Sequence, residues 1–136
     1  MEPAANASAT SRCHCGAVEI VARFPSRFCV HCYCASCRRT HGAGVVTWIG
    51  FPRSQVEFAK GAELLRDYLS SSGTHRRYCS ACGTRMTFES EHGRWAEEVH
   101  LPLAMFVTPV DREPSGNSFA EERPPWAPFH PDEPAA

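Results

Sequence analysis

Eight cysteines, seven of them in three short clusters, constrain the fold of this 136-residue chain more than any other feature. The clusters are Cys13-His14-Cys15, Cys32-Tyr33-Cys34-Ala35-Ser36-Cys37 and Cys79-Ser80-Ala81-Cys82. Within each cluster the thiols are spaced to face one point, as the ligands of a metal ion do. Reduced intracellular cysteines favour metal over disulfides, although a disulfide framework remains an alternative to the metal sites.

Cys79 and Cys82 have the spacing of half a zinc site. They stand three positions apart in a turn that ends at Gly83, and glycine supplies the positive φ needed where the chain turns beneath a metal. A structural zinc ion needs four ligands, so Cys13 and Cys15 are expected to provide the other two. The alternatives are a thioredoxin-like redox pair in the late cluster, which lacks its βαβ setting here, and two buried or reactive thiols in the early one.

The middle cluster predicts a different kind of site. Cys32, Cys34 and Cys37 lie within six residues, and in a compact loop all three can hold one zinc ion. Three protein ligands leave the fourth position open for water or substrate, which is the form of a catalytic zinc site.

Residues next to the middle cluster leave two questions open: whether a fourth protein ligand completes the site, and which residue offsets its negative charge. Cys29 and His31 are each placed to act as a fourth ligand, which would make the site purely structural. Arg38 is a candidate for holding an anionic substrate or offsetting the excess negative charge, whereas Arg39 is as well explained as a solvated surface residue.

The pattern of apolar residues predicts a mainly β fold with many turns. Strand-like alternation or β-branched and aromatic composition marks several segments, and residues 63–69 fit either a strand or a helical face. Trp48 and Trp95 are expected in the core, and no long, well-capped helix is predicted. The predicted strands are residues 18–24, 45–51, 55–58 and 98–107, with a hairpin at 77–89.

Composition divides the chain into one domain and two tails. Residues 1–10 are expected to be disordered, 11–123 to form the zinc-binding domain, and 124–136 to form a Pro-rich tail. Trp126 and Phe129 are expected to pin this tail to the domain.

The charge balance disfavours nucleic acid as a partner. Lysine and arginine number 14 against 15 acidic residues, a net charge of −1. No apolar run is long enough for a membrane helix, and the first ten residues lack the features of a signal peptide, so a cytoplasmic location without membrane contact is predicted.

Taken together, the motifs resemble those of the glutathione-dependent formaldehyde-activating enzyme (GFA) family. The shared pattern is an early Cys-x-Cys-Gly, then Cys-x-Cys-x-x-Cys-Arg-Arg, then Cys-x-x-Cys-Gly-Thr, and the similarity spans about residues 11–110. Two departures stand out: Tyr33 replaces a frequent histidine, and residues 114–119 lack the histidine that many members carry near the C-terminus.

The resemblance implies an Mss4-like fold of small antiparallel sheets around zinc-binding cysteine turns. It also implies two zinc ions per chain, a structural one held by the early and late clusters and a more labile one held by the middle cluster. The implied activity is that of a carbon–sulfur lyase acting on adducts of a small thiol, such as glutathione, with a small aldehyde. Cys32, Cys34 and Cys37 would carry the catalytic ion, and Arg38 would bind a substrate anion.

A non-catalytic, zinc-stabilised binding module is the competing hypothesis. Arginines are frequent in the second half of the domain and would form a cationic face for an anionic partner. The candidates are Arg76, Arg77, Arg85 and Arg94.

Overall fold

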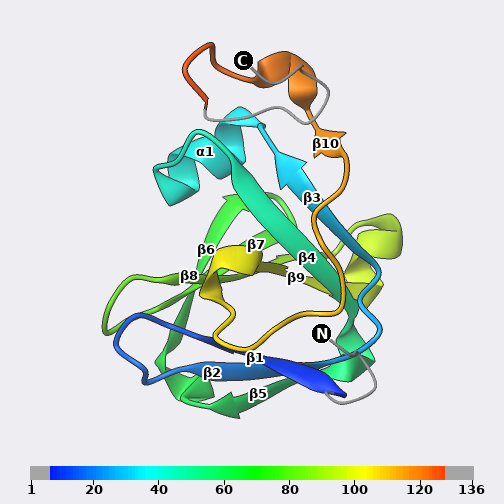
Figure 1. The fold of residues 1–136 in the computed structure, drawn as a ribbon. Helices are drawn as coiled ribbons and strands as arrows, with labels where there is room; N and C mark the ends of the chain where they lie inside the picture. The colour runs from blue at the N-terminus through cyan, green and yellow to red at the C-terminus, as the bar shows by residue number, and fades with distance from the viewer. Residues whose placement is uncertain (1–6, 128–136) are drawn as a thin grey trace.

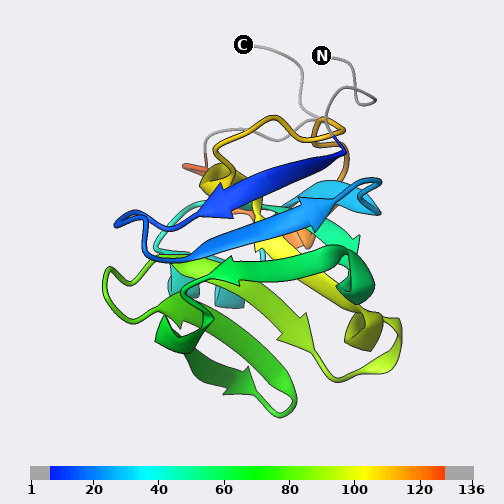
Figure 2. The same cartoon turned by 90° about the horizontal axis from the view of Figure 1, so that it is seen from below.

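Residues 7–127 form two β-sheets in the computed structural model of the chain. The predicted disorder of residues 1–6 and the proposed role of Phe129 concern positions outside this range. The smaller sheet lies beneath the larger one in the view of Figure 1, and Figure 2 shows it from below. The fold is therefore mainly β with antiparallel sheets, as the sequence predicts.

The smaller sheet has three antiparallel strands in the order β1-β2-β5. Alternate residues of β1 and β2 are buried, so each strand has one core face and one outer face. The strands are β1 (Ser8–Arg12), β2 (Glu19–Arg23) and β5 (Val56–Lys60).

The larger sheet has seven strands in the order β10-β3-β4-β9-β8-β7-β6. All its neighbours are antiparallel except β10, which pairs parallel to β3. The central strands β4 and β9 are almost fully buried, which suits the apolar, β-branched and aromatic residues of β4, whereas β9 buries the polar Glu98 and His100 between its apolar residues. The strands are β3 (Phe28–Cys32), β4 (Val46–Pro52), β6 (Leu65–Ser71), β7 (Thr74–Cys79), β8 (Arg85–Ser90), β9 (Glu98–Pro102) and β10 (Asn117–Ser118).

One short α-helix and several single turns of 3₁₀-helix connect the strands. The helix α1 (Ala35–His41) ends at Gly42, whose positive φ of 63° closes it in the left-handed conformation. The 3₁₀ turns are η2 (Arg53–Gln55), η3 (Ala62–Leu64), η4 (Gly93–Glu97), η5 (Leu103–Met105) and η6 (Ala120–Glu122).

The main core lies between the two sheets. Ile20 and Ala22 of the small sheet face Ile49, Phe51 and other fully buried residues of the large sheet. A second, smaller cluster around Trp48 and Val46 includes Cys32 and Cys37. The middle cysteine cluster is therefore part of a separate apolar layer, away from the main core.

The structure confirms most predicted strands and corrects several details. Residues 8–10, expected to be disordered, belong to β1, because they pair with β2 along its length. Residues 65–69 are strand, since β7 pairs with them in register. Trp95 is 38% exposed and Trp126 is 69% exposed, so Trp95 is not a core residue and Trp126 does not pin the tail.

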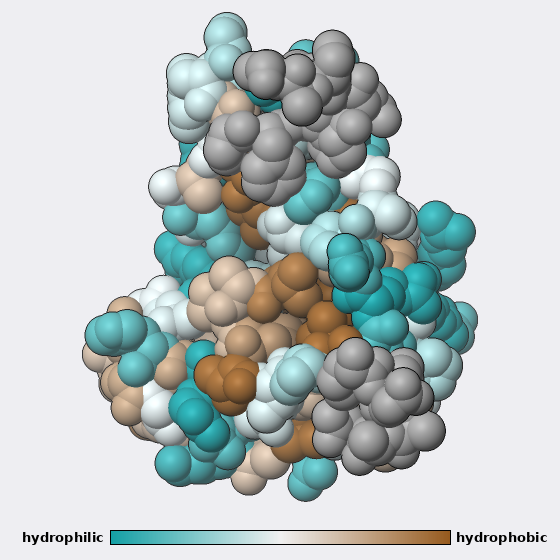
Figure 3. Space-filling view, in the orientation of Figure 1, coloured by the Kyte–Doolittle hydropathy of each residue, from teal (hydrophilic) through white to brown (hydrophobic). Residues whose placement is uncertain are grey.

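None of the helices in residues 7–127 is long and apolar enough to cross a membrane. On the face shown in Figure 3, apolar side chains gather near the centre and hydrophilic ones line the edges. Leu103 and Phe106, in and after η5, are partly buried and pack against the main core.

Candidate metal centres and cavity

The early and late cysteine clusters meet in one place. Cys13 and Cys15 follow β1, Cys79 ends β7, and Cys82 lies in the turn before β8. Sulfur–sulfur distances are 3.6 Å between Cys13 and Cys15 and 3.9 Å between Cys15 and Cys79. All four sulfur atoms lie within 4.8 Å of one another. The loop after β1 is thus joined to the β7–β8 hairpin.

Local hydrogen bonds shape this four-cysteine group. Gly83, with φ of 81°, donates its N–H to the Cys79 carbonyl at 2.7 Å and closes the turn. The Val18 N–H donates to the Cys13 sulfur at 3.2 Å. Hydrogen bonds from the Thr84 hydroxyl and N–H lower the pKa of the Cys82 thiol to about 5. These donors favour thiolates, the form in which cysteine binds metal.

The middle cluster forms a second group of three sulfur atoms. Cys32 ends β3, Cys34 is the N-cap of α1, and Cys37 lies in the first turn of the helix. The Cys37 N–H donates to the Cys34 sulfur at 3.2 Å, and the Cys32 and Cys37 sulfurs are 3.6 Å apart. The expectation of a compact loop is wrong in detail, because α1 begins within the motif and the Cys34 sulfur caps it.

Both groups fit a zinc ion by geometry and by donor chemistry. Tetrahedral zinc with Zn–S bonds of about 2.3 Å sets sulfur atoms about 3.8 Å apart, and the measured separations of 3.6–3.9 Å match. Hydrogen bonds from the Cys32 and Cys37 thiols lower the pKa of Cys34, so the group already favours a thiolate. All eight cysteines are free thiols, so the disulfide alternative is wrong for this structure.

Neither candidate for a fourth ligand joins the middle group. Cys29 faces the main core, where burial raises the pKa of its thiol to about 11. The His31 Nδ1 lies 2.9 Å from the Thr47 hydroxyl. Within residues 7–127, the metal-binding group at this place consists of Cys32, Cys34 and Cys37 alone, which leaves a fourth coordination position open.

Arg76 supplies the positive charge beside the three sulfur atoms. Only 5% of this residue is exposed, and its guanidinium lies 3.7 and 3.8 Å from the Cys37 sulfur. It also binds the hydroxyl groups of Ser36, Thr40 and Ser70, and it lies over the Phe88 ring at 4.9 Å. In the described part of the chain no carboxylate pairs with Arg76, so the cysteine group is the counter-charge of this buried cation.

The predicted arginines lie elsewhere or act differently. Arg38 does not line the cavity beside the three cysteines, and its Nε donates to the Tyr33 carbonyl at 2.9 Å. Arg76 is buried, and Arg85 donates to the Thr40 carbonyl and stacks on Tyr78. The predicted cationic face is therefore not a single exposed surface. Sequence spacing gave no signal for Arg76, since it follows Cys37 by 39 residues.

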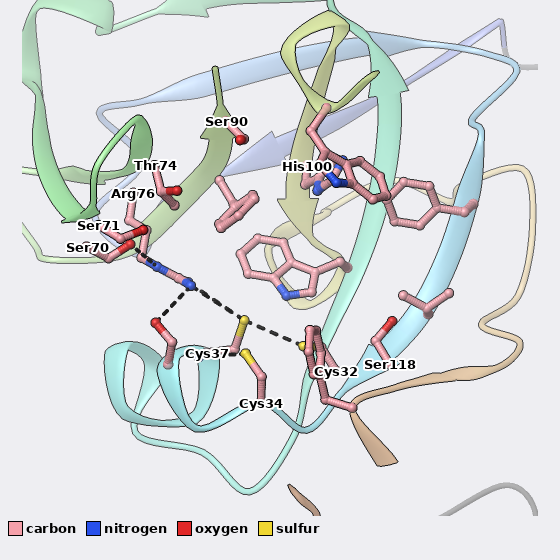
Figure 4. Close-up of a pocket in the computed structure, with 17 residues that line it drawn as sticks. Cys32, Cys34, Cys37, Ser70, Ser71, Thr74, Arg76, Ser90, His100 and Ser118 are labelled. Carbon is pink, nitrogen blue, oxygen red and sulfur yellow. Dashed lines mark hydrogen bonds between the residues drawn. The ribbon is translucent and has the colours of Figure 1, made fainter. Parts of the chain in front are cut away.

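A cavity of about 410 Å³ opens beside the three-cysteine group (Figure 4). Hydroxyl-bearing residues line one side, including Ser70, Ser71 and Thr74 of the β6–β7 hairpin. Aromatic rings line the other, including those of Trp48 and His100. Ligand sites in proteins have this size and this mixture of apolar wall and few polar groups.

The fold and these sites define a class: a small β protein with one group of four cysteines and one group of three cysteines beside a cavity, each able to hold a metal ion. The family model for "Glutathione-dependent formaldehyde-activating enzyme" matches residues 8–122, so the chain belongs to this family. A Halomonas elongata protein described as "Putative glutathione-dependent formaldehyde-activating enzyme" is 32% identical, over 84% of this chain and 76% of the relative. A crystal structure of a Rhodobacter sphaeroides protein is similar with a TM-score of 0.58 and 29% identity, covering 71% of this chain and 85% of the other.

Proposed function

We propose that the chain is a zinc-dependent carbon–sulfur lyase acting on the adduct of a small thiol, of glutathione type, with a small aldehyde. The observation that carries the proposal is the opening of the three-cysteine group onto a cavity of about 410 Å³. The name of the Halomonas elongata relative, which includes glutathione and formaldehyde, supports the same chemistry. Residues 11–123 would act as one domain, and reduced thiols suit a cytoplasmic location.

The two zinc ions would have different roles, one structural and one catalytic. Cys13, Cys15, Cys79 and Cys82 would hold a closed, structural ion, and Cys32, Cys34 and Cys37 would hold the second one. When bound, this second ion lowers the pKa of a thiol at its open position and so supplies a nucleophile near neutral pH.

The residues of the cavity would bind and orient the reactants. In adduct formation the thiol sulfur attacks the carbonyl carbon, the C=O electron pair moves to oxygen, and the oxygen gains the proton that the thiol has lost. Cleavage is the reverse. Ser70 and Thr74 provide hydroxyl donors on the cavity wall for that oxygen, and Arg76 offsets the negative charge that gathers around sulfur.

The test is adduct formation by the zinc-loaded chain with several thiols, glutathione among them. We expect rates above the uncatalysed reaction, and loss of the increase in Cys34→Ser. If every thiol and aldehyde reacts at the uncatalysed rate, the proposal fails and the non-catalytic binding module is the better description.

A further inference from the structure

One wall of the cavity is built of interlocked rings. His100 is stacked on Phe88 with ring centroids 5.6 Å apart, and Phe28 and Trp95 meet it edge-on at 4.9 and 5.3 Å. Trp48 continues the wall beside Phe88 at 5.7 Å. All five rings line the cavity, so a ligand there meets an aromatic surface.

Gly50 makes room for this wall. A Cβ atom at this position would lie 2.2 Å from the Phe28 ring, which no side chain can occupy. Phe28 therefore lies flat across β4 at the place where Gly50 pairs with His100 on β9. The aromatic wall is specified by the backbone of the central strands as well as by its rings.

The rings at the cavity mouth are only partly covered by protein. Trp95 on η4 and Phe119 before η6 are 38% and 52% exposed, and both line the cavity. Phe119 has a φ of 56°, a conformation that is unfavourable for a bulky side chain. The strained backbone of Phe119 and the partial exposure of both rings point to a ligand that covers them.

Strand register gives the distance from the cysteine group to the far end of the aromatic wall. Along β4, Val46 pairs with Cys32 and Gly50 pairs with His100, and four residues of strand span roughly 13 Å. The near end of the aromatic wall lies beside the cysteines, because Trp48 and Phe88 pack in one apolar cluster with Cys32 and Cys37. A thiol bound there has this end of the wall within reach of its next few atoms. Formaldehyde, with two heavy atoms, is too small to cover the rings, so the group that covers them belongs to the thiol or to a larger aldehyde.

We propose that the cavity takes an aromatic thiol or the thiol adduct of an aromatic aldehyde, with the ring against the wall of Phe28, Phe88, Trp95 and His100. The inference rests on the proposed function for the position of the sulfur, at Cys32, Cys34 and Cys37. The ring makes no new bond in the reaction, and its contribution is burial of apolar surface next to the reacting atoms.

Binding to the zinc-loaded full chain, measured by isothermal titration calorimetry, tests the aromatic wall without turnover. We expect benzyl mercaptan to bind at least about tenfold more tightly than 2-mercaptoethanol. Trp95→Ala and Phe119→Ala are expected to remove most of this preference, because they weaken benzyl mercaptan binding far more than 2-mercaptoethanol binding. Trp126→Ala is the matched control, because Trp126 is 69% exposed and outside the cavity lining.

Turnover distinguishes the two sources of the ring. Benzyl mercaptan with formaldehyde and 2-mercaptoethanol with benzaldehyde are compared with glutathione and formaldehyde, and at least one aromatic pair is expected to give the highest kcat/KM. Equal binding of the two thiols, or a loss of both in Trp95→Ala, overturns the inference. If no pair reacts above the uncatalysed rate but benzyl mercaptan still binds preferentially, the proposed function fails and the aromatic site stands.

Discussion

The charge that balances the three-cysteine group comes from an arginine far from it in sequence. Arg38 follows Cys37 directly, and its place in the motif made it the natural candidate, yet its Nε binds the Tyr33 carbonyl. Arg76 reaches the cluster only because β7 carries it there. The spacing of residues along the chain predicts metal ligands that are close together in sequence. It does not predict a charged partner such as Arg76, which strand pairing brings to the cluster from a distant part of the chain.

Arg76→Met tests this charge balance. We expect affinity for the second zinc to fall about 10- to 100-fold, because a group that contacts a metal ligand would be lost, whereas the first zinc stays bound. Arg76→Lys keeps the positive charge but lacks the planar guanidinium group. We expect its affinity for the second zinc to lie between those of the unsubstituted protein and Arg76→Met. Competition with a zinc chelator, followed by metal analysis, measures each affinity.

Arg77→Met is the matched control for this variant. Arg77 is the next residue on β7, and its Nε lies 3.4 Å from Glu89, away from the cysteines. Equal loss of zinc in the Arg76 and Arg77 variants would contradict the assigned role of Arg76.

At the level of elements, the residues typical of turns and the alternation of apolar and polar residues predicted the hairpin and most strands. The Cys79–Gly83 turn is where the motif requires it, since a glycine at φ of 81° closes it. The helix α1 has only seven residues, too few for a repeating apolar face to show in the sequence. The register of β6 with β7 decided residues 65–69, because pairing outweighs a weak helical pattern.

The different positions of the two cysteine groups predict different results for Cys79→Ser and Cys34→Ser. Cys79 joins β7 to the loop after β1, and it is fully buried in the main core. Its loss should lower the thermal midpoint strongly or prevent folding, because the energy of a structural zinc is folding energy.

Cys34→Ser should leave the chain folded with one metal fewer, because Cys34 caps a single short helix beside the cavity. Circular dichroism melts and zinc content are measured on both variants. If both variants unfold equally, the assignment of a structural role to the four-cysteine group alone is wrong.

On the scale of the whole molecule, the sequence predicted the class of fold and the partition of the seven clustered cysteines, which the structure gathers into groups of four and three. The strand order and the parallel β10–β3 pair were not predictable, because they depend on contacts between distant segments. The aromatic wall belongs to the same category, since its rings come from β3, β4, β8, η4 and β9.

Glu98 and His100 of β9 make the stability of the whole fold depend on pH. The His100 Nε2 lies 2.9 Å from one Glu98 oxygen, and Arg27 donates to the other at 2.9 Å. Burial lowers the pKa of His100 below 6.5, although the bond to Glu98 opposes this. Burial would raise the pKa of Glu98, but hydrogen bonds from His100 and Arg27 outweigh it and lower that pKa.

The lowered pKa values of His100 and Glu98 both make the free energy of unfolding decrease as the pH falls. Below pH 6.5 the unfolded chain binds a proton at His100 that the folded chain does not, so stability falls as the pH falls toward the folded pKa of His100. His100→Gln keeps a donor for Glu98 and removes the titration. We therefore expect the pH slope of the variant to be shallower between pH 6.5 and 5, by at most about 1.4 kcal/mol per pH unit. Urea unfolding of both zinc-loaded proteins at matched pH measures the slopes, and identical slopes would exclude His100 as a source of the pH dependence.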